Sequence, residues 1–258
     1  MLIVISPAKR LDWSPQPVSL TTPDFLSEAN SLARTMRART LTEIKGLMGL
    51  SDDLARLNRD RYRGYSDAPD GDALRPAALA FAGDTYQGLE ADTLDPDEMN
   101  WAQDHLRILS GLYGVLRPLD GIQPYRLEMG SRLKTRRGKN LYDYWGDAPA
   151  RSLKAQAKSI GSDTLINCAS QEYFGVVDTD KLGLRILTPT FLEEKDGKAK
   201  IVSFFAKKAR GAMARFIITQ RITNPEGVLD FELGGYTYDE SASSPDQPVF
   251  KRPYNDAK

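Results

Sequence analysis

The segment from Lys207 to Arg221 could bind phosphate groups, because it concentrates positive charge in a part of the sequence without acids. From residue 197 to 225 the chain has seven Lys or Arg residues and no Asp or Glu. A solvated helix normally mixes both signs, since opposite charges three or four residues apart stabilise it and like charges oppose it. We therefore interpret the segment as a phosphate-binding surface; the alternative is a solvated helix whose cations pair with acids from elsewhere. The candidate residues are Lys207, Lys208, Arg210, Gly211 and Arg215.

Gly211 has a special place in this interpretation. At 100° per residue, the apolar residues of the segment fall on one face of a helix, and Gly211 lies near the centre of the opposite face. A glycine inside a helix costs roughly 1 kcal/mol relative to alanine. Together with Ala214 it would leave a low gap between the cations, where a backbone or a phosphate could come close.

A second basic region precedes this one, in residues 125 to 142, where Arg126 and five further cations face a single acid. Tyrosines and a tryptophan surround it, and such interleaving suits a surface that binds phosphates and stacks bases. The alternative is a polar hairpin between core aromatics.

Just upstream, Gly111 and Gly114 could let backbone amides approach an anion, or they could simply form a tight turn. Two cations flank them, Arg107 and Arg117.

Polar residues follow two short apolar runs that are typical of buried strands. Ser6 and Lys9 follow "LIVI", while Asn167 and Ser170 follow the apolar start of "TLINCAS". Because α/β proteins tend to bind ligands at the carboxyl edge of the sheet, these side chains could form a pocket. In an enzyme, Lys9 would bind a phosphate, Ser170 would orient a substrate, and a carboxylate would accept a proton. Structural capping is the alternative for Ser6 and Ser170. The pocket would also include Glu128, Glu172 and Tyr173.

The sequence has few residues for a transition-metal site or for nucleophilic catalysis. His105 is the only histidine and Cys168 the only cysteine. One chain therefore cannot supply a facial triad, a thiolate cluster or a zinc site, and His105 has no obvious Ser or Cys partner for catalysis. We predict no metal site and no cofactor.

The elements that must position these residues indicate a mixed α/β fold. Buried strands are expected at 2 to 5 and 164 to 170, and a hairpin around Asp196 and Gly197 is expected to pair "LRILTP" with "AKIVSFF". Asp95 before Pro96 is a strong helix start. The expected helices cover residues 25 to 38, 41 to 61, 97 to 109, 149 to 159 and 205 to 222, and two late strands lie in 231 to 240 and 248 to 253. No repeat or linker divides the chain, so we predict one domain over residues 1 to 258, a mixed sheet surrounded by helices.

Composition sets the broad class. The chain has 258 residues, a formal net charge of +0 and 27% charged residues. Neutrality argues against a protein that coats nucleic acid with its whole surface, but it allows a local basic groove. A single cysteine excludes an intrachain disulfide and suits a reducing compartment. Without a signal sequence or a long apolar run, a cytoplasmic protein without membrane contact is expected.

Five motifs are together specific for one family: "LIVISPAK", "LRILSGLYGVLRPLDGIQPYRLEMG", "NLYDYWGD", "INCASQEYF" and "FFAKKARGAMARFI". On these motifs the chain resembles, over nearly its full length, the YaaA family of bacterial peroxide-stress-response proteins. The resemblance implies an unusual α/β fold with a positively charged cleft, a helix-hairpin-helix-like element and binding to duplex DNA. It also implies that the protein limits peroxide damage by lowering intracellular free iron. The hairpin best matches Gly111 to Gly114 with flanking helices, and the cleft cations match Lys9, Arg126, Lys207, Lys208, Arg210 and Arg215.

The sequence therefore predicts a DNA-binding stress-protection protein whose partner is double-stranded DNA, and a monomer is favoured. The runner-up is an enzyme that acts on a nucleotide or another phosphorylated small molecule in a polar cleft.

Overall fold

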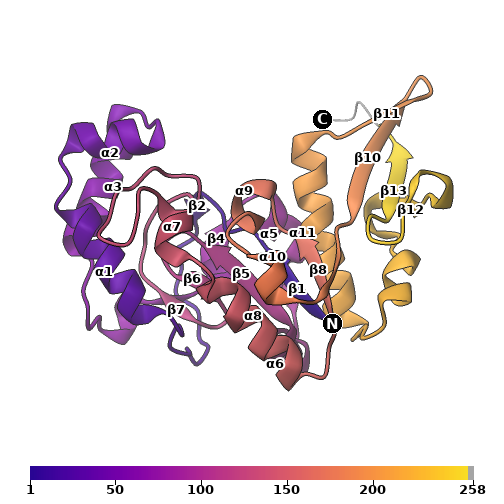
Figure 1. Cartoon of the computed structure of the whole chain (residues 1–258), viewed down its shortest axis with the longest axis horizontal. Helices are drawn as coiled ribbons and strands as arrows, with labels where there is room; N and C mark the ends of the chain where they lie inside the picture. The colour runs from indigo at the N-terminus through magenta and orange to yellow at the C-terminus, as the bar shows by residue number, and fades with distance from the viewer. Residues whose placement is uncertain (255–258) are drawn as a thin grey trace.

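The first apolar run forms the central strand of a five-stranded sheet (Figure 1). The structure is a computed structural model, and it describes residues 1–254. The strand order is β6-β5-β1-β8-β9. Strands β5, β1, β8 and β9 are parallel, and β6 is antiparallel to β5. In register, Ile5 of β1 lies opposite Ile108 of β5 and Cys168 of β8. The strands are β1 (Leu2–Ile5), β5 (Leu106–Ser110), β6 (Gly114–Leu116), β8 (Thr164–Cys168) and β9 (Arg185–Leu187).

The sheet order creates a switch point between β1 and β8. After β1 the chain continues to β5 on one side, and after β8 it continues to β9 on the other. In open α/β sheets such a point leaves a crevice beyond the carboxyl ends of the two strands, where ligands bind. Ser6 follows β1 and Ser170 follows β8, so both lie at this crevice.

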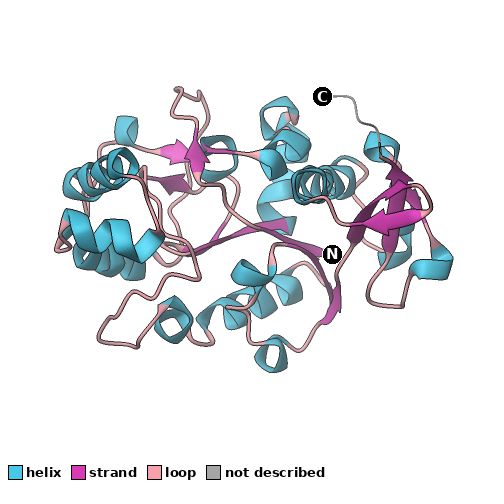
Figure 2. Ribbon diagram, turned by 90° about the horizontal axis from the view of Figure 1, so that it is seen from above, coloured by secondary structure: helices cyan, strands magenta, loops and turns pink. Residues whose placement is uncertain are grey.

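Helices lie on both sides of the central sheet, as Figure 2 shows. Three helices at one end of the molecule are α1 (Leu26–Arg37), α2 (Leu41–Met48) and α3 (Asp52–Gly64). The predicted helix 41 to 61 is thus two helices, because Gly49 ends α2 in the left-handed conformation and Ser51 caps α3. The remaining α-helices are α4 (Ala77–Ala80), α5 (Asp84–Leu89), α6 (Pro96–His105), α7 (Leu141–Trp145), α8 (Ala148–Ser159), α9 (Gln171–Phe174), α10 (Thr179–Leu182) and α11 (Ser203–Thr219).

Helices α5 and α11 touch backbone to backbone. A Cβ atom on Gly211 would lie 1.7 Å from the carbonyl oxygen of Thr85, and one on Gly88 would lie 2.0 Å from that of Lys208. No side chain fits at either position. This contact fixes the start of α5 beside the basic helix.

A second, four-stranded sheet lies at the C-terminal end of the molecule, with the order β11-β10-β13-β12. Asp196 and Gly197 form its hairpin turn, as predicted. The predicted partners were wrong, however. "LRILTP" contributes β9 to the central sheet, parallel to β8, and the hairpin joins the strands on either side of residues 196 and 197. These strands are β10 (Thr190–Lys195), β11 (Lys198–Lys200), β12 (Thr237–Tyr238) and β13 (Val249–Pro253).

Short strands complete the fold, in two pairs: β2 (Arg10–Leu11) with β4 (Phe81–Ala82), and β3 (Arg75–Pro76) with β7 (Gly121–Ile122). The predicted start of α6 is confirmed, because Asp95 and Glu98 form a reciprocal capping box. Its predicted end is wrong, since α6 stops at His105 and the next five residues are β5. Within residues 1–254, no helix combines the length and apolarity needed to cross a bilayer. The predicted domain of 1 to 258 includes four residues, 255 to 258, outside the described part.

The helix-hairpin-helix assignment is also corrected. Gly111 and Gly114 lie at a turn between antiparallel strands β5 and β6, with no helix on either side. Gly111 is needed for a close approach, because a Cβ atom there would lie 2.2 Å from the carbonyl oxygen of Leu127. Gly114 has a φ of +69° and faces the Trp145 ring, whose indole N–H donates to the Gly111 carbonyl. Gly111 therefore lets the turn pack against the segment around Leu127, and Gly114 lets it pack against Trp145.

Candidate functional site

The two strand ends at the switch point are joined by hydrogen bonds. The Ser6 hydroxyl oxygen accepts a hydrogen bond from the backbone N–H of Ser170 (2.9 Å) and lies 3.3 Å from the Ser170 hydroxyl oxygen. The Tyr86 hydroxyl donates to the Ser6 carbonyl at 3.1 Å. Ser170 also caps α9, as the structural alternative proposed. Both serines therefore organise the edge of the sheet.

A cavity of about 500 Å³ opens above this edge, between the loop after β1, the start of α5, α9 and α11. Charged groups of both signs line it. Lys9 comes from the loop, Arg10 from the start of β2, and Lys207 and Arg210 from α11, whereas Asp84 of α5 and Glu172 of α9 supply carboxylates. We call it the edge cavity. Its other lining residues are Ser6, Pro7, Ala8, Ala82, Gly83, Thr85, Tyr86, Gln87, Cys168, Ser170 and Tyr173.

An alternating segment runs past one side of the edge cavity. In residues 125 to 134 every odd-numbered residue is buried and every even-numbered one is half-buried or exposed. The period-2 pattern is readable in "YRLEMGSRLK", but the prediction for this region rested on its charges and aromatic residues alone. The outward residues, which we call the basic strip, are Arg126, Glu128, Gly130, Arg132 and Lys134.

Glu128 is the acid that anchors the strip to the cavity wall. Its Oε1 lies 2.9 Å from Nζ of Lys9 and 2.9 Å from a terminal nitrogen of Arg126. Lys9 remains mostly exposed, whereas the Arg126 side chain is only 14% exposed. Within residues 1–254 the buried Nε of Arg126 has no hydrogen-bond partner. One carboxylate therefore restrains two of the predicted cleft cations.

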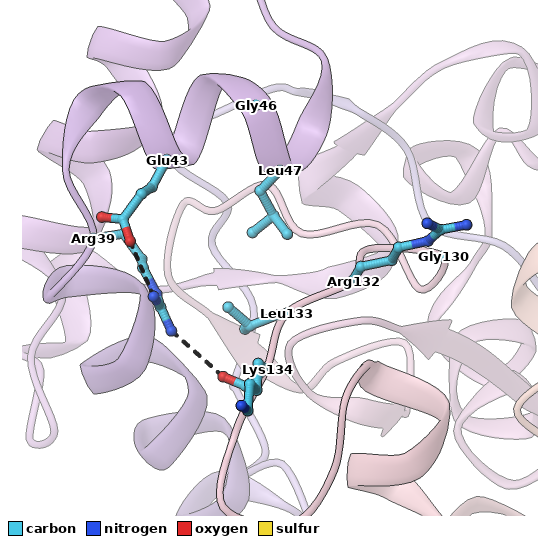
Figure 3. A pocket seen from close by; sticks show the side chains of 8 residues that line it. All are labelled: Arg39, Glu43, Gly46, Leu47, Gly130, Arg132, Leu133 and Lys134. Carbon is cyan, nitrogen blue, oxygen red and sulfur yellow. Dashed lines mark hydrogen bonds and ion pairs between the residues drawn. The ribbon is translucent and has the colours of Figure 1, made fainter.

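The strip leads to a second hollow of about 530 Å³, beside α2. Figure 3 shows Arg39 between Glu43 and the backbone of Lys134, while Arg132 points away from Leu47 and Leu133. Gly130 belongs to this hollow, and its N–H donates to Oε1 of Glu172 in the edge cavity at 3.0 Å. The two hollows are thus neighbours joined by one contact.

The sequence of this chain is similar to known proteins over nearly its whole length. A family model described as "Peroxide stress protein YaaA" matches residues 1–242. The chain belongs to the YaaA family. It is 67% identical over 254 residues to a UPF0246 protein of Ruegeria pomeroyi and 66% identical over 256 residues to one of Roseobacter denitrificans. It is 51% identical over 255 residues to one of Caulobacter vibrioides, and each match covers 98% of this chain and 99% of the relative. Membership in the YaaA family supports a role in peroxide stress.

Several candidate residues of this YaaA-family chain lie away from the edge cavity or are engaged in the fold. Arg107 is 5% exposed and donates to the carbonyls of Gln103 and Leu106, and burial, with Arg117 nearby, lowers the pKa of its guanidinium to about 10. Arg117 pairs with the buried Asp120 at 2.9 Å. Both arginines are therefore engaged in structural contacts, Arg107 with backbone carbonyls and Arg117 with a buried carboxylate.

The basic helix is also more engaged than its sequence indicated. Gly211 and Ala214 are buried, so no gap between cations is open to a ligand. Arg215 donates to the carbonyls of Leu89 and Glu90 at the end of α5. Lys208 is exposed but lines a different hollow, with Phe204 and Arg252. Lys207 and Arg210 are the two helix cations that reach the edge cavity.

Of the predicted pocket residues, the structure brings together Ser6, Ser170, Glu172 and Tyr173 in the edge cavity, with Glu128 at its rim. Asn167 is 7% exposed and accepts from the Ala169 N–H, so it shapes the turn after β8. Sequence reasoning missed Arg10 and Asp84. Arg10 follows Lys9 directly, and Asp84 follows a glycine at a helix start, so both signals were local and readable.

The single cysteine lies at the floor of the edge cavity. Burial raises the pKa of the Cys168 thiol to about 12, and the nearby Arg210 offsets only part of this shift. At neutral pH the group is therefore a protonated thiol, which is a poor nucleophile and metal ligand. His105 lies at the other end of the sheet, stacked on Trp101 with its Nδ1 2.8 Å from the Met1 carbonyl oxygen.

Proposed function

We propose that this chain binds duplex DNA through the cations around the edge cavity and the basic strip, and that it limits peroxide damage in this way. Support comes from one observation above all: cations from three separate parts of the chain lie on adjoining surfaces. They are Lys9, Arg10, Arg132, Lys207 and Arg210. Within residues 1–254, no ion pair engages Arg132, Lys207 or Arg210, and Lys9 pairs only with Glu128. In the described part of the chain, Arg132 and Lys207 are exposed and Arg210 is half-buried, and none of the three has a carboxylate partner, so they can pair with a phosphate backbone.

We also propose that any lowering of free iron is an indirect effect of this binding. His105 and Cys168 lie at opposite ends of the central sheet, near Met1 and opposite Ile5 respectively. They are too far apart along β1 to share a metal ion. Protection of DNA or a change in iron handling by other proteins would then connect binding to iron.

The direct test is fluorescence anisotropy with a labelled 20-base-pair duplex. Wild type is compared with the double variant Lys207→Gln/Arg210→Gln and with a control, Lys158→Gln/Lys181→Gln, which removes two exposed cations from α8 and α10. We expect the site variant to bind at least tenfold more weakly, because each lost phosphate contact is worth about 1 kcal/mol or more. The control should stay within twofold. Equal affinity of all three proteins would contradict the proposal.

A second candidate function is an enzyme that acts on a nucleotide or another phosphorylated small molecule. The edge cavity favours it, because its volume lies within the roughly 300–1,000 Å³ of small-molecule sites and it holds hydroxyls, cations and carboxylates together. Glu172 is the candidate proton acceptor, with its Oε1 already bonded to Gly130. Phosphorus NMR of a nucleotide mixture incubated with the protein would reveal turnover. Turnover that is lost in Glu172→Gln would support the enzyme, whereas an unchanged mixture would exclude it for those nucleotides.

A further inference from the structure

The edge cavity is too small for the duplex that its surroundings could bind. Its volume of about 500 Å³ equals that of a sphere roughly 10 Å across. One major groove of a duplex is already wider, at ~12 Å, and the whole duplex is wider still. A duplex would have to lie across the rim. Only a group that projects from the duplex, or a small molecule, can reach Ser6, Cys168 and Ser170 at the floor.

The charges of the cavity select against a plain anion. Lys207 and Arg210 on α11 attract phosphate, but Asp84 and Glu172 on α5 and α9 repel it and accept hydrogen bonds instead. A fitting ligand therefore has an anionic end and, within the same 500 Å³, a neutral end with hydrogen-bond donors. The exocyclic amino groups of cytosine and adenine are such donors, and carboxylates accept from the cytosine amino group in known readout.

Aromatic and hydroxyl groups complete this match. Tyr86 and Tyr173 line the cavity with small exposed fractions, 8% and 9%, and Tyr86 is held by its bond to Ser6. Rigid aromatic edges of this kind pack against a sugar or a base without large ordering costs.

We infer that the edge cavity binds one unpaired nucleotide, with its phosphate at Lys207 and Arg210 and its base amino group toward Asp84 and Glu172. The inference deepens the proposed function by naming the ligand that the edge cavity selects. Where that ligand is part of a DNA strand, the inference rests on the proposed DNA binding. The nucleotide can come from two sources, a free mononucleotide or the unpaired end of a DNA strand. The chemistry is the same in both, and two experimental arms separate them.

The first arm is calorimetric titration of the full chain with dCMP, dTMP, deoxycytidine and inorganic phosphate. We expect dCMP to bind at least fivefold more tightly than dTMP, and deoxycytidine and phosphate to bind at least tenfold more weakly than dCMP. Lys207→Gln should weaken dCMP binding about tenfold. Lys208→Gln, the neighbour on α11 that lines another hollow, should leave it within twofold. Asp84→Asn should bring dCMP and dTMP to within twofold of each other while the protein stays folded.

The second arm compares a blunt 20-base-pair duplex with the same duplex carrying a three-nucleotide cytosine overhang. We expect the overhang to raise affinity at least fivefold in wild type, and this gain to disappear in Asp84→Asn, whose rim cations are intact. A gain from the overhang identifies the strand end as the source, and dCMP binding without such a gain identifies the free nucleotide.

The outcomes separate this inference from the proposed function. Duplex binding with no dCMP binding and no overhang gain would overturn the inference and leave the DNA proposal standing. Selective dCMP binding without duplex binding would support the inference for the free nucleotide and contradict the DNA proposal. Equal binding of dCMP, dTMP and phosphate would also overturn the inference, because it would reduce the cavity to a simple anion site.

Discussion

The contact between α5 and α11 predicts a large effect from adding a single methyl group. In Gly211→Ala the new Cβ atom would lie 1.7 Å from the Thr85 carbonyl oxygen and 2.9 Å from the Leu89 nitrogen. Carbon and oxygen atoms do not approach closer than about 3 Å, so the helices must separate by more than an ångström. Both colliding groups are backbone, and no rotamer change can relieve the contact.

The expected cost follows from these distances. Overpacking costs typically about 1–3 kcal/mol, and a backbone collision belongs at the upper end. Alanine regains about 1 kcal/mol of helix propensity. We therefore expect a net loss of about 2 kcal/mol in the free energy of unfolding, which is a fall in Tm of about 4–8 °C for a chain of this size. Gly46→Ala in α2 is the matched control, because nothing lies within 4 Å of its added Cβ atom. It should be stabilised by up to ~1 kcal/mol.

Urea denaturation followed by circular dichroism measures both variants, and thermal melts give the Tm values. Gly88→Ala should behave like Gly211→Ala, since its Cβ atom meets the Lys208 carbonyl oxygen from the opposite helix. If Gly211→Ala were as stable as wild type, α5 would not lie against α11 as described. The position of Asp84 and Thr85 in the cavity wall would then be wrong as well.

Three further predictions concern charges and the thiol. Glu128→Gln should raise affinity for duplex DNA about three- to tenfold at low salt, because it frees Lys9 and Arg126 from their carboxylate partner. The control Asp53→Asn, on the distant surface of α3, should change the affinity less than twofold. Anisotropy titrations measure both affinities. Cys168 should not react with a thiol reagent in the native protein at pH 7.5, and Cys168→Ser should keep peroxide protection in cells. Rapid labelling of the native protein would contradict this prediction, and so would a loss of protection at unchanged stability. The free energy of unfolding should fall in alkali, because the pKa of Cys168 is 9.0 in the unfolded chain and about 12 in the folded chain. The Cys168 thiol therefore contributes its full share of stability below pH 9, and this share is lost as the pH rises from 9 to 12. At pH 10 the loss from this thiol is about 1 kcal/mol, so urea midpoints of wild type should fall more steeply from pH 8 to pH 10 than those of Cys168→Ser.

The sequence predicted those parts of the fold whose signals are local. The strands Leu2–Ile5 and Thr164–Cys168 were expected from short apolar runs, and the start of α6 from Asp95 and Pro96. The predicted helix at 97 to 109 wrongly included most of the strand Leu106–Ser110. A fully buried five-residue strand has no alternation to distinguish it from a buried helical turn, and pairing with β1, more than 100 residues earlier, decides its structure.

The candidate site was predictable for residues that directly follow a strand. It was not predictable for residues whose exposure depends on contacts with distant parts of the chain. Ser6, Lys9, Ser170 and Glu172 meet because parallel strands end at the same edge of a sheet. Helical periodicity placed Gly211 opposite the apolar face, but it could not show that α5 covers that side of the helix. Arg107 and Arg117 looked free in the sequence because their partners, backbone carbonyls for Arg107 and the Asp120 carboxylate for Arg117, reach them only in the folded chain.

The salt dependence of duplex binding tests the central claim most directly. The logarithm of the binding constant should fall linearly with the logarithm of salt concentration, with a slope of about −0.9 for each phosphate neutralised. Lys207→Gln/Arg210→Gln should reduce the steepness by about two units if both cations contact phosphates, at similar cost for unrelated duplex sequences. Lys158→Gln/Lys181→Gln, which removes the same charge from α8 and α10, should leave the slope unchanged. An unchanged slope in the folded site variant would contradict the account, because the edge cavity would then take no part in DNA binding.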